Sequence, residues 1–234
     1  MSVAFFPLTT DLRLVVGGTR PGRDPSIENL WRAACGKNPR LFDGPVLAVR
    51  SIDMAAGVIE ATPDRFAHVV CQASDRSVPV TILSVTGVIE STIDERPHVL
   101  LARRGLRTRS YPDMWEFAPA GGLHIPERPG VFGLHHVLET LSTELNEEVG
   151  VRSPLRGARA IGLVVDAVAR SVDVVVRTAL EGAAPPLRTS DEHAWECSEA
   201  QWIPVDAFDD VIDHLVGGVI EPTRAIARHL GWTR

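Results

Sequence analysis

The chain has 234 residues, a length that suits one large domain or one domain with a substantial extension. Its composition, 44% hydrophobic and 23% charged, is typical of a globular protein. A net charge of -6 and a pI near 5.7 argue against a nucleic-acid-binding surface, and no apolar run approaches the roughly 20 residues of a membrane span.

The first third of the sequence is predicted to form short strands around one helix. The segment 24–36 predicts that helix, with Asp24 or Ser26 as its cap, Pro25 at its start and Gly36 at its end. A polar stretch at 72–79 predicts a boundary, which divides the chain into a β-rich N-terminal extension, 1–77, and a catalytic domain, 78–234. The predicted strands of the extension lie at 3–6, 12–16, 46–52 and 57–61.

The remaining two thirds alternate apolar strands with helical segments. A loop rich in glycine and proline, 118–133, precedes a helix predicted at 134–149. Such mixed strands and helices predict an α/β or α+β layered fold. Further strands are predicted at 80–90, 98–104, 159–168, 172–180 and 201–205, and further helices at 206–216 and 222–230.

The helix at 134–149 carries a group of acidic residues at its C-terminal end. Glu144, Glu147 and Glu148 are spaced i, i+3 and i+4, so they are predicted to share a face, and Gly150 is predicted to end the helix in the left-handed conformation. Like charges at this spacing and at this end of the helix dipole are unfavourable. A bound divalent cation such as Mg²⁺ would compensate for them, and a solvated acidic face is the alternative.

These acidic residues belong to a segment, "ELNEEVGV" at 144–151, that resembles the second half of the Nudix box. The stretches "WEFAPAGG" and "QWIPVDAF" resemble segments that flank the box in that family. The resemblance covers roughly residues 80 to 210 and implies an α/β/α sandwich with a mixed sheet. It also implies a hydrolase that uses Mg²⁺ or Mn²⁺ to cleave a diphosphate linked to another moiety.

The resemblance implies roles for the acidic residues. Glu144, Glu147 and Glu148 would bind the metal, with Glu147 and Glu148 also catalytic. The loop "TSDEHAWE" resembles one that brings a further acid to the site, so Glu192 is predicted as a ligand or general base, with Asp191 as second choice. A polar surface loop is the alternative.

The first half of the box departs from the family pattern. Thr143 stands where the family has arginine, His135 where it has an earlier glutamate, and Pro129 where it has glycine. Glu127 or Glu139 is a candidate to replace the missing glutamate. These departures favour an alternative function, a catalytically degenerate Nudix-like module that binds nucleotides or regulates.

Substrate contacts are predicted next to this segment. The arginines that follow the strand at 98–104 are suited to diphosphate oxygens, with a solvated hairpin tip as the alternative. Trp115 could stack on a base or sugar, although a strand tryptophan is more often part of the core. The predicted substrate-binding residues are Arg103, Arg104, Arg107, Arg109, Trp115, Gly121 and Gly122.

The segment "NPRLFDGPVLAVRS" at 38–51 resembles an upstream phrase of the branch that includes UDP-glucose and UDP-galactose diphosphatases. Its turn formers offer a purely structural explanation. The resemblance implies a nucleotide sugar as substrate and a nucleoside monophosphate and a sugar phosphate as products. Another diphosphate, such as a dinucleotide or a biosynthetic intermediate, is the less favoured reading.

The expected setting is cytoplasmic. Cys35, Cys71 and Cys197 are odd in number and widely spaced, which indicates neither a disulfide framework nor a zinc site, and the N-terminus lacks the features of a signal peptide. The expected partner is a small nucleotide rather than nucleic acid or a membrane. A homodimer is a further expectation, because Nudix proteins often dimerise and the N-terminal extension offers an interface.

Overall fold

The computed structural model describes all residues except 1–2, 73–74, 76–78 and 189–194. Within this part of the chain the strands form one mixed sheet of twelve strands. These are β1 Val3–Pro7, β2 Arg13–Val16, β3 Pro45–Asp53, β4 Val58–Arg65, β5 Ile82–Ile93, β6 Arg96–Arg104, β7 Trp115–Phe117, β8 Ala120–Gly122, β9 Gly130–Phe132, β10 Leu155–Asp166, β11 Ser171–Ala183 and β12 Cys197–Pro204.

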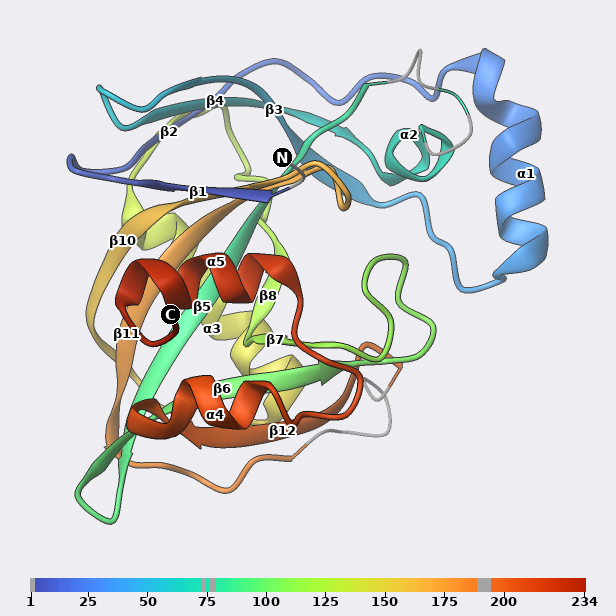
Figure 1. Ribbon diagram of the computed structural model, residues 1–234. Helices are drawn as coiled ribbons and strands as arrows, with labels where there is room; N and C mark the ends of the chain where they lie inside the picture. Colours follow the sequence, from blue (N-terminus) through green and yellow to red (C-terminus); the bar gives the residue numbers. More distant parts are fainter. Residues whose placement is uncertain (1–2, 73–74, 76–78, 189–194) are drawn as a thin grey trace.

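Helices cover both faces of the sheet, which gives the α/β/α sandwich that was expected. In Figure 1, α4 and α5 lie in front of the central strands and α3 lies behind them. The helices are α1 Glu28–Lys37, α2 Phe66–Cys71, α3 Leu134–Val149, α4 Phe208–Ile212 and α5 Glu221–Leu230, and short 3₁₀ turns occupy Pro25–Ile27 and Val205–Ala207.

Helix α3 packs against the sheet through an apolar stripe. Val137, Leu141, Leu145 and Val149 recur at helical spacing and are all buried. Gly150 ends the helix with φ of 70°, and its amide donates to Asn146 O, as the sequence predicted. The predicted helix bounds are therefore confirmed, and its orientation is fixed by the buried stripe.

Strand β5 approaches α3 closely because one of its residues is glycine. A Cβ at Gly87 would lie 2.8 Å from Leu141 Cδ1 and 3.1 Å from Pro119 Cδ, closer than such atoms pack. Strand β5 pairs in parallel with β11 and antiparallel with β6 and β8. The close approach sets the distance between the acidic helix and the strands that face it.

The N-terminal strands join the same sheet as the rest of the chain. Strand β1 pairs with β10, Ala48 of β3 pairs with Ile82 of β5, and β2 pairs with β9. The segment 118–133, predicted as a loop, thus contains two strands, β8 and β9. Their partners are distant in sequence, so local composition did not reveal them.

A second helix follows β4 in the N-terminal region, where the sequence predicted one helix only. This helix, α2, packs on α1, and Trp31 and Ile27 contact a cluster that includes Ala67 and Cys71. Its six residues are too short and too apolar for helical periodicity to show. The predicted boundary between residues 77 and 78 lies outside the described residues.

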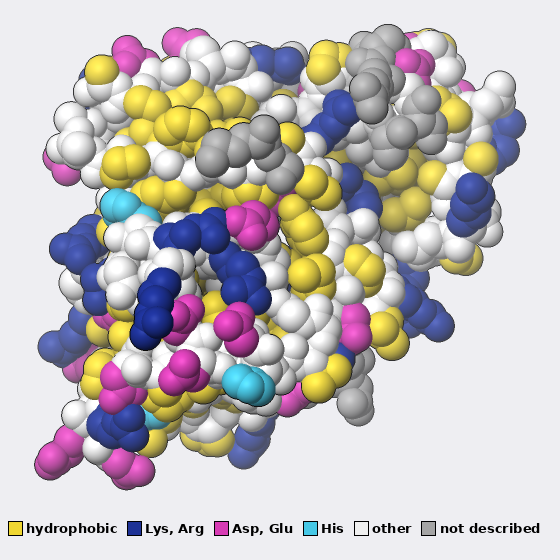
Figure 2. Space-filling view, in the orientation of Figure 1, with side chains coloured by type: hydrophobic (Ala, Val, Ile, Leu, Met, Phe, Trp, Pro, Cys, Tyr) yellow, Lys and Arg dark blue, Asp and Glu magenta, His cyan; other side chains and the backbone are white. Residues whose placement is uncertain are grey.

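The two C-terminal helices close the other face. Helix α4 is shorter than predicted, and α5 ends at Gly231, which has φ of 73°. Acidic and basic side chains alternate over this region in Figure 2, in agreement with the ion pairs Arg224–Asp213 and Arg228–Glu221. In the part of the chain described, every helix is too short or too polar to cross a membrane.

Candidate active site

The last turns of α3 present three glutamates in different environments. Glu148 is buried, with 6% of its surface exposed, whereas Glu144 is half-buried and Glu147 is exposed. Residues four apart lie one above the other on a helix, so Glu144 and Glu148 both face β8. Glu147 lies at the solvent edge of this group and still raises the pKa of Glu144.

Strand β7 brings a fourth carboxylate that sequence reasoning missed. Trp115 and Phe117 are buried in the core beneath α4 and α5, so Glu116 between them points to the opposite side of the sheet. This alternation was readable from the letters "WEF". Glu116 accepts a hydrogen bond from Arg104 Nη1 at 2.5 Å.

The carboxylates repel one another in a buried setting. Burial, followed by the charges of Glu116, Glu144 and Glu196, raises the pKa of Glu148 well above its ordinary 4.5. Burial, followed by Glu196 and Glu147, raises the pKa of Glu144 to about 7. Each carboxylate therefore disfavours the ionised form of its neighbours, and a cation among them would relieve this repulsion.

Backbone atoms of β8 hold this group at close range. The amide of Ala120 donates to Glu148 Oε1 at 3.3 Å, and a Cβ at Gly121 would collide with the carboxyl group of Glu144. Gly122, by contrast, has open space around its Cα. Glycine at 121 is therefore what allows Glu144 to reach the strand.

The donor set is suited to a hard divalent cation, because every candidate ligand is a carboxylate oxygen. Within the described ranges, however, no three His, Cys, Asp or Glu side chains are already arranged to hold a metal ion. The chemistry thus fits Mg²⁺ or Mn²⁺, and the ligands must adjust to take it.

The predicted arginines separate into different environments. Arg103 and Arg104 are adjacent on β6, so their side chains point to opposite faces. Arg103 pairs with Asp113 at 3.0 Å, whereas Arg104 faces the carboxylates and also donates to Ser110 O at 2.9 Å. Arg104 and Arg109 line a polar cavity, and together with Arg107 they also line a neighbouring apolar one.

The polar cavity has a volume of about 210 Å³ and lies beside the glutamates. Gly121 and Gly122 line it together with Arg104, Glu116 and Glu196. Three further ionisable residues on its wall were missed by the sequence: Tyr111, Asp166 and Asp173. They come from strands and loops distant in sequence, and no local motif brings them together.

Asp173 on β11 is the unusual member of this cavity. Its Oδ1 is shielded from solvent and has no hydrogen-bond partner among the described residues. Burial raises its pKa to about 7. Asp166, in contrast, accepts from Tyr111 Oη at 2.7 Å and from the amides of Val168 and Ala169.

The other predicted site residues either lie away from the group of glutamates or lie outside the described residues. Trp115 is 2% exposed and donates from Nε1 to Val216 O at 3.1 Å, so the structure places it in the core, the reading the sequence favoured. His135 is exposed and pairs with Glu139, which is also exposed, and Glu127 is exposed in the loop before α3. Glu192 and Asp191 lie outside the described residues.

No family model matches the chain, and no curated protein matches it. Among solved structures, the NUDIX domain of Shewanella oneidensis NrtR, complexed with ADP ribose, is 14% identical with a TM-score of 0.44, covering 68% of this chain and 94% of that chain. The MutT protein from Methanosarcina mazei Go1 is 16% identical with a TM-score of 0.47, covering 64% of this chain and 93% of that one.

A bifunctional NMN adenylyltransferase/ADP ribose pyrophosphatase from Francisella tularensis, complexed with AMP and a Mn ion, is 16% identical. Its TM-score is 0.46, and the match covers 64% of this chain and 41% of that chain. Nudix proteins are thus among the structural neighbours of this chain. At these identities and TM-scores, the likeness does not by itself assign the chain to a family.

Proposed function

We propose that this chain is a metal-dependent diphosphatase of the Nudix type. The observation that carries the proposal is the convergence of Glu144 and Glu148 of α3 with Glu116 of β7, beside a cavity lined by two arginines. Such an arrangement is costly for stability, because buried like charges repel one another. It is explained if the carboxylates bind a cation that a phosphate substrate also contacts.

Glu144, Glu147 and Glu148 are the proposed ligands, and Glu116 extends the set. Bound there, Mg²⁺ or Mn²⁺ would neutralise charge on the phosphate oxygens. Arg104 and Arg109 face the same cavity and would hold the diphosphate through their guanidinium groups. These residues would fix the phosphate chain before reaction.

The chemical step is attack of a water molecule on one phosphorus, with cleavage of the bond to the bridging oxygen. In this proposal Glu147 or Glu148, ionised once the cation is bound, would accept the proton of that water. Glu192 stays a predicted further ligand or base. The two products each carry one phosphate.

The proposed substrate is a nucleoside diphosphate linked to a sugar, and the products are a nucleoside monophosphate and a sugar phosphate. Support comes from the resemblance of residues 38–51 to the UDP-sugar branch, and residues 38 and 40–42 of that segment line the neighbouring apolar cavity. A panel of nucleotide sugars, dinucleotides and ADP-ribose, with products identified by mass, tests the choice.

The second candidate is a Nudix-like binding or regulatory module without catalysis. Thr143 and His135 favour it, as does the lack of a preformed three-ligand cluster within the described residues. Substrate-dependent thermal stabilisation in the presence of Mg²⁺, without release of monophosphate, would support this module.

The decisive variant is Glu148→Gln, which keeps the size of the side chain and removes its charge. We expect it to lose nearly all Mg²⁺-dependent monophosphate release. Glu139→Gln, an exposed glutamate on the same helix, is the matched control and should keep its activity. Full activity in the Glu148→Gln variant would remove the proposed mechanism.

A further inference from the structure

Two cavities of different chemistry meet at the arginine that faces the glutamates. Arg104, together with Glu196, lines the polar cavity, the apolar cavity and the small pocket that contains Glu148. The apolar cavity is the larger, about 610 Å³ against about 210 Å³ for the polar one. A phosphate group bound at Arg104 would therefore have a distinct chamber on each side.

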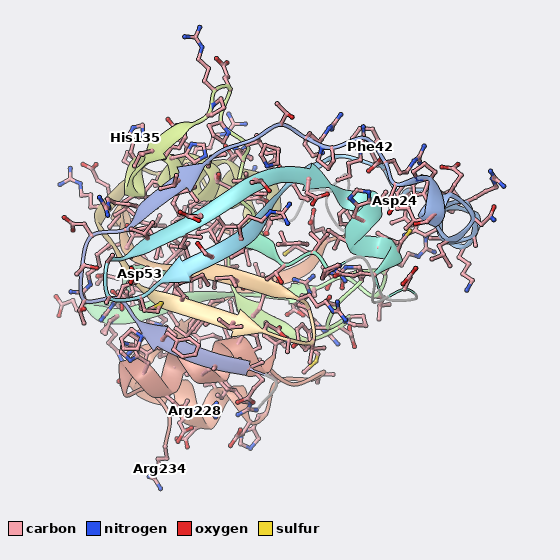
Figure 3. All side chains as sticks on the ribbon, turned by 90° about the horizontal axis from the view of Figure 1, so that it is seen from above. Asp24, Phe42, Asp53, His135, Arg228 and Arg234 are labelled. Carbon is pink, nitrogen blue, oxygen red and sulfur yellow. The ribbon has the colours of Figure 1, made fainter. Side chains whose placement is uncertain are left out.

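The N-terminal region builds one wall of the apolar cavity. Phe42 and Leu41, between α1 and β3, line it together with Phe66 and Val70 of α2 and with Trp195. In Figure 1 the segment that follows α1 runs opposite the loop between β6 and β7, and Figure 3 labels Phe42 on it. Figure 2 shows hydrophobic side chains between α1 and the sheet, with basic side chains around them.

The segment that carries Phe42 is held in place although the Phe42 ring is exposed. Asp43 accepts from the amide of Ala67 at 3.0 Å and pairs with Arg65 at 2.8 Å, which fixes the chain next to Phe42. Phe42 itself is 77% exposed, and Trp195 is 42% exposed. Aromatic rings held at the mouth of a cavity and beside arginines provide flat surfaces for a nucleobase.

The polar cavity offers the opposite chemistry. Asp173, whose Oδ2 accepts from Thr86 Oγ1 at 3.3 Å, lines it together with Ser84 and Ser171. Carboxyl and hydroxyl groups on a cavity wall are hydrogen-bond partners for a polyhydroxyl ligand. A sugar is such a ligand.

We propose that the cleft binds a nucleotide sugar in one orientation, with the base against Phe42 and Trp195 and the sugar against Asp173. This inference rests on the proposed function and adds to it. The N-terminal region becomes part of the substrate site, and the carboxylates act on a diphosphate that lies between the two chambers.

Calorimetric titration with UMP and with glucose 1-phosphate, in the presence of Ca²⁺, tests each chamber separately on the full chain. Phe42→Ala should weaken UMP at least about 5-fold, the lower end of the effect of losing one base–aromatic stack, and leave glucose 1-phosphate within 2-fold. Asp173→Asn should do the reverse, weakening glucose 1-phosphate about 10-fold. Phe6→Ala, an exposed phenylalanine on β1, is the matched control and should change neither.

The KM for UDP-glucose hydrolysis, measured in the same variants, covers the case in which the fragments bind too weakly to titrate. Each of the two cleft variants should then raise KM with little change in kcat, after circular dichroism has confirmed its fold. Unchanged KM and unchanged binding in both variants, with hydrolysis intact, would overturn the orientation and leave the proposed function standing. If the chain binds UMP through Phe42 but hydrolyses nothing, the proposed function fails, and the assignment of the apolar cavity as the base-binding site is supported.

Discussion

Glutamine at position 144 should stabilise the chain at alkaline pH in the absence of divalent cations. Glu144 is half-buried beside Glu148 and Glu196, and its pKa rises from an ordinary 4.5 to about 7 in the folded chain. The folded state therefore holds the proton more tightly than the unfolded state. Stability then falls as pH rises from about 4.5 through about 7.

The size of the effect follows from that pKa. At about 1.4 kcal/mol for each pKa unit, ionisation of Glu144 costs about 2 to 3 kcal/mol, after allowance for its partial exposure. In the parent chain this cost applies at pH 8, and most of it is absent at pH 5. Glu144→Gln removes the cost because glutamine does not ionise. The variant should gain about 2 kcal/mol over the parent at pH 8 relative to pH 5.

Urea unfolding in EDTA at both pH values measures this difference. Glu127→Gln, an exposed glutamate in the loop before α3, serves as the control and should shift stability by less than about 0.5 kcal/mol at either pH. An equal stability difference between Glu144→Gln and the parent at pH 5 and pH 8 would refute the conclusion that partial burial and neighbouring carboxylates raise the pKa of Glu144 in the folded chain.

The remaining predictions concern the cation, the strand that faces it and the core. Mg²⁺ should raise the melting temperature more at pH 8 than at pH 5, because the ligands must be ionised to bind it; equal shifts would contradict the assignment. Gly121→Ala should displace the Glu144 carboxyl and abolish both this Mg²⁺ shift and the activity, whereas Gly122→Ala, with open space around it, should preserve the Mg²⁺ shift. Leu141→Ala should lower the free energy of unfolding by about 2 to 5 kcal/mol in denaturant titration, while Leu106→Ala, 77% exposed, should change it little.

The sequence predicted the elements that are set by local pattern. Helix α3 and its glycine cap, the long strands β5, β10 and β11, and the layered α/β class all follow from periodicity and turn formers. Strands β8 and β9 were missed because each has three residues and a partner far along the chain. Helix α2 was missed because its apolar residues show no helical period.

The candidate site was predictable to the same extent. Glu144 and Glu148 were identified from their spacing, but spacing alone did not distinguish the buried Glu148 from the exposed Glu147. Glu116 could have been inferred from the two aromatic residues that flank it. Asp173 could not, because its role depends on cavity walls that only the assembled sheet brings together.

The pairing of β9 with β2 has a consequence for any attempt to shorten this protein. Strand β9, which leads directly into α3, pairs with Leu14, Val15 and Val16 of β2, and β1 covers the outer edge of β10. Removing the first 77 residues would strip both partners at once. The fragment would expose the unpaired edge of β10, with which other chains can form hydrogen bonds. Strand β9, which immediately precedes α3, would also have lost β2 as its partner.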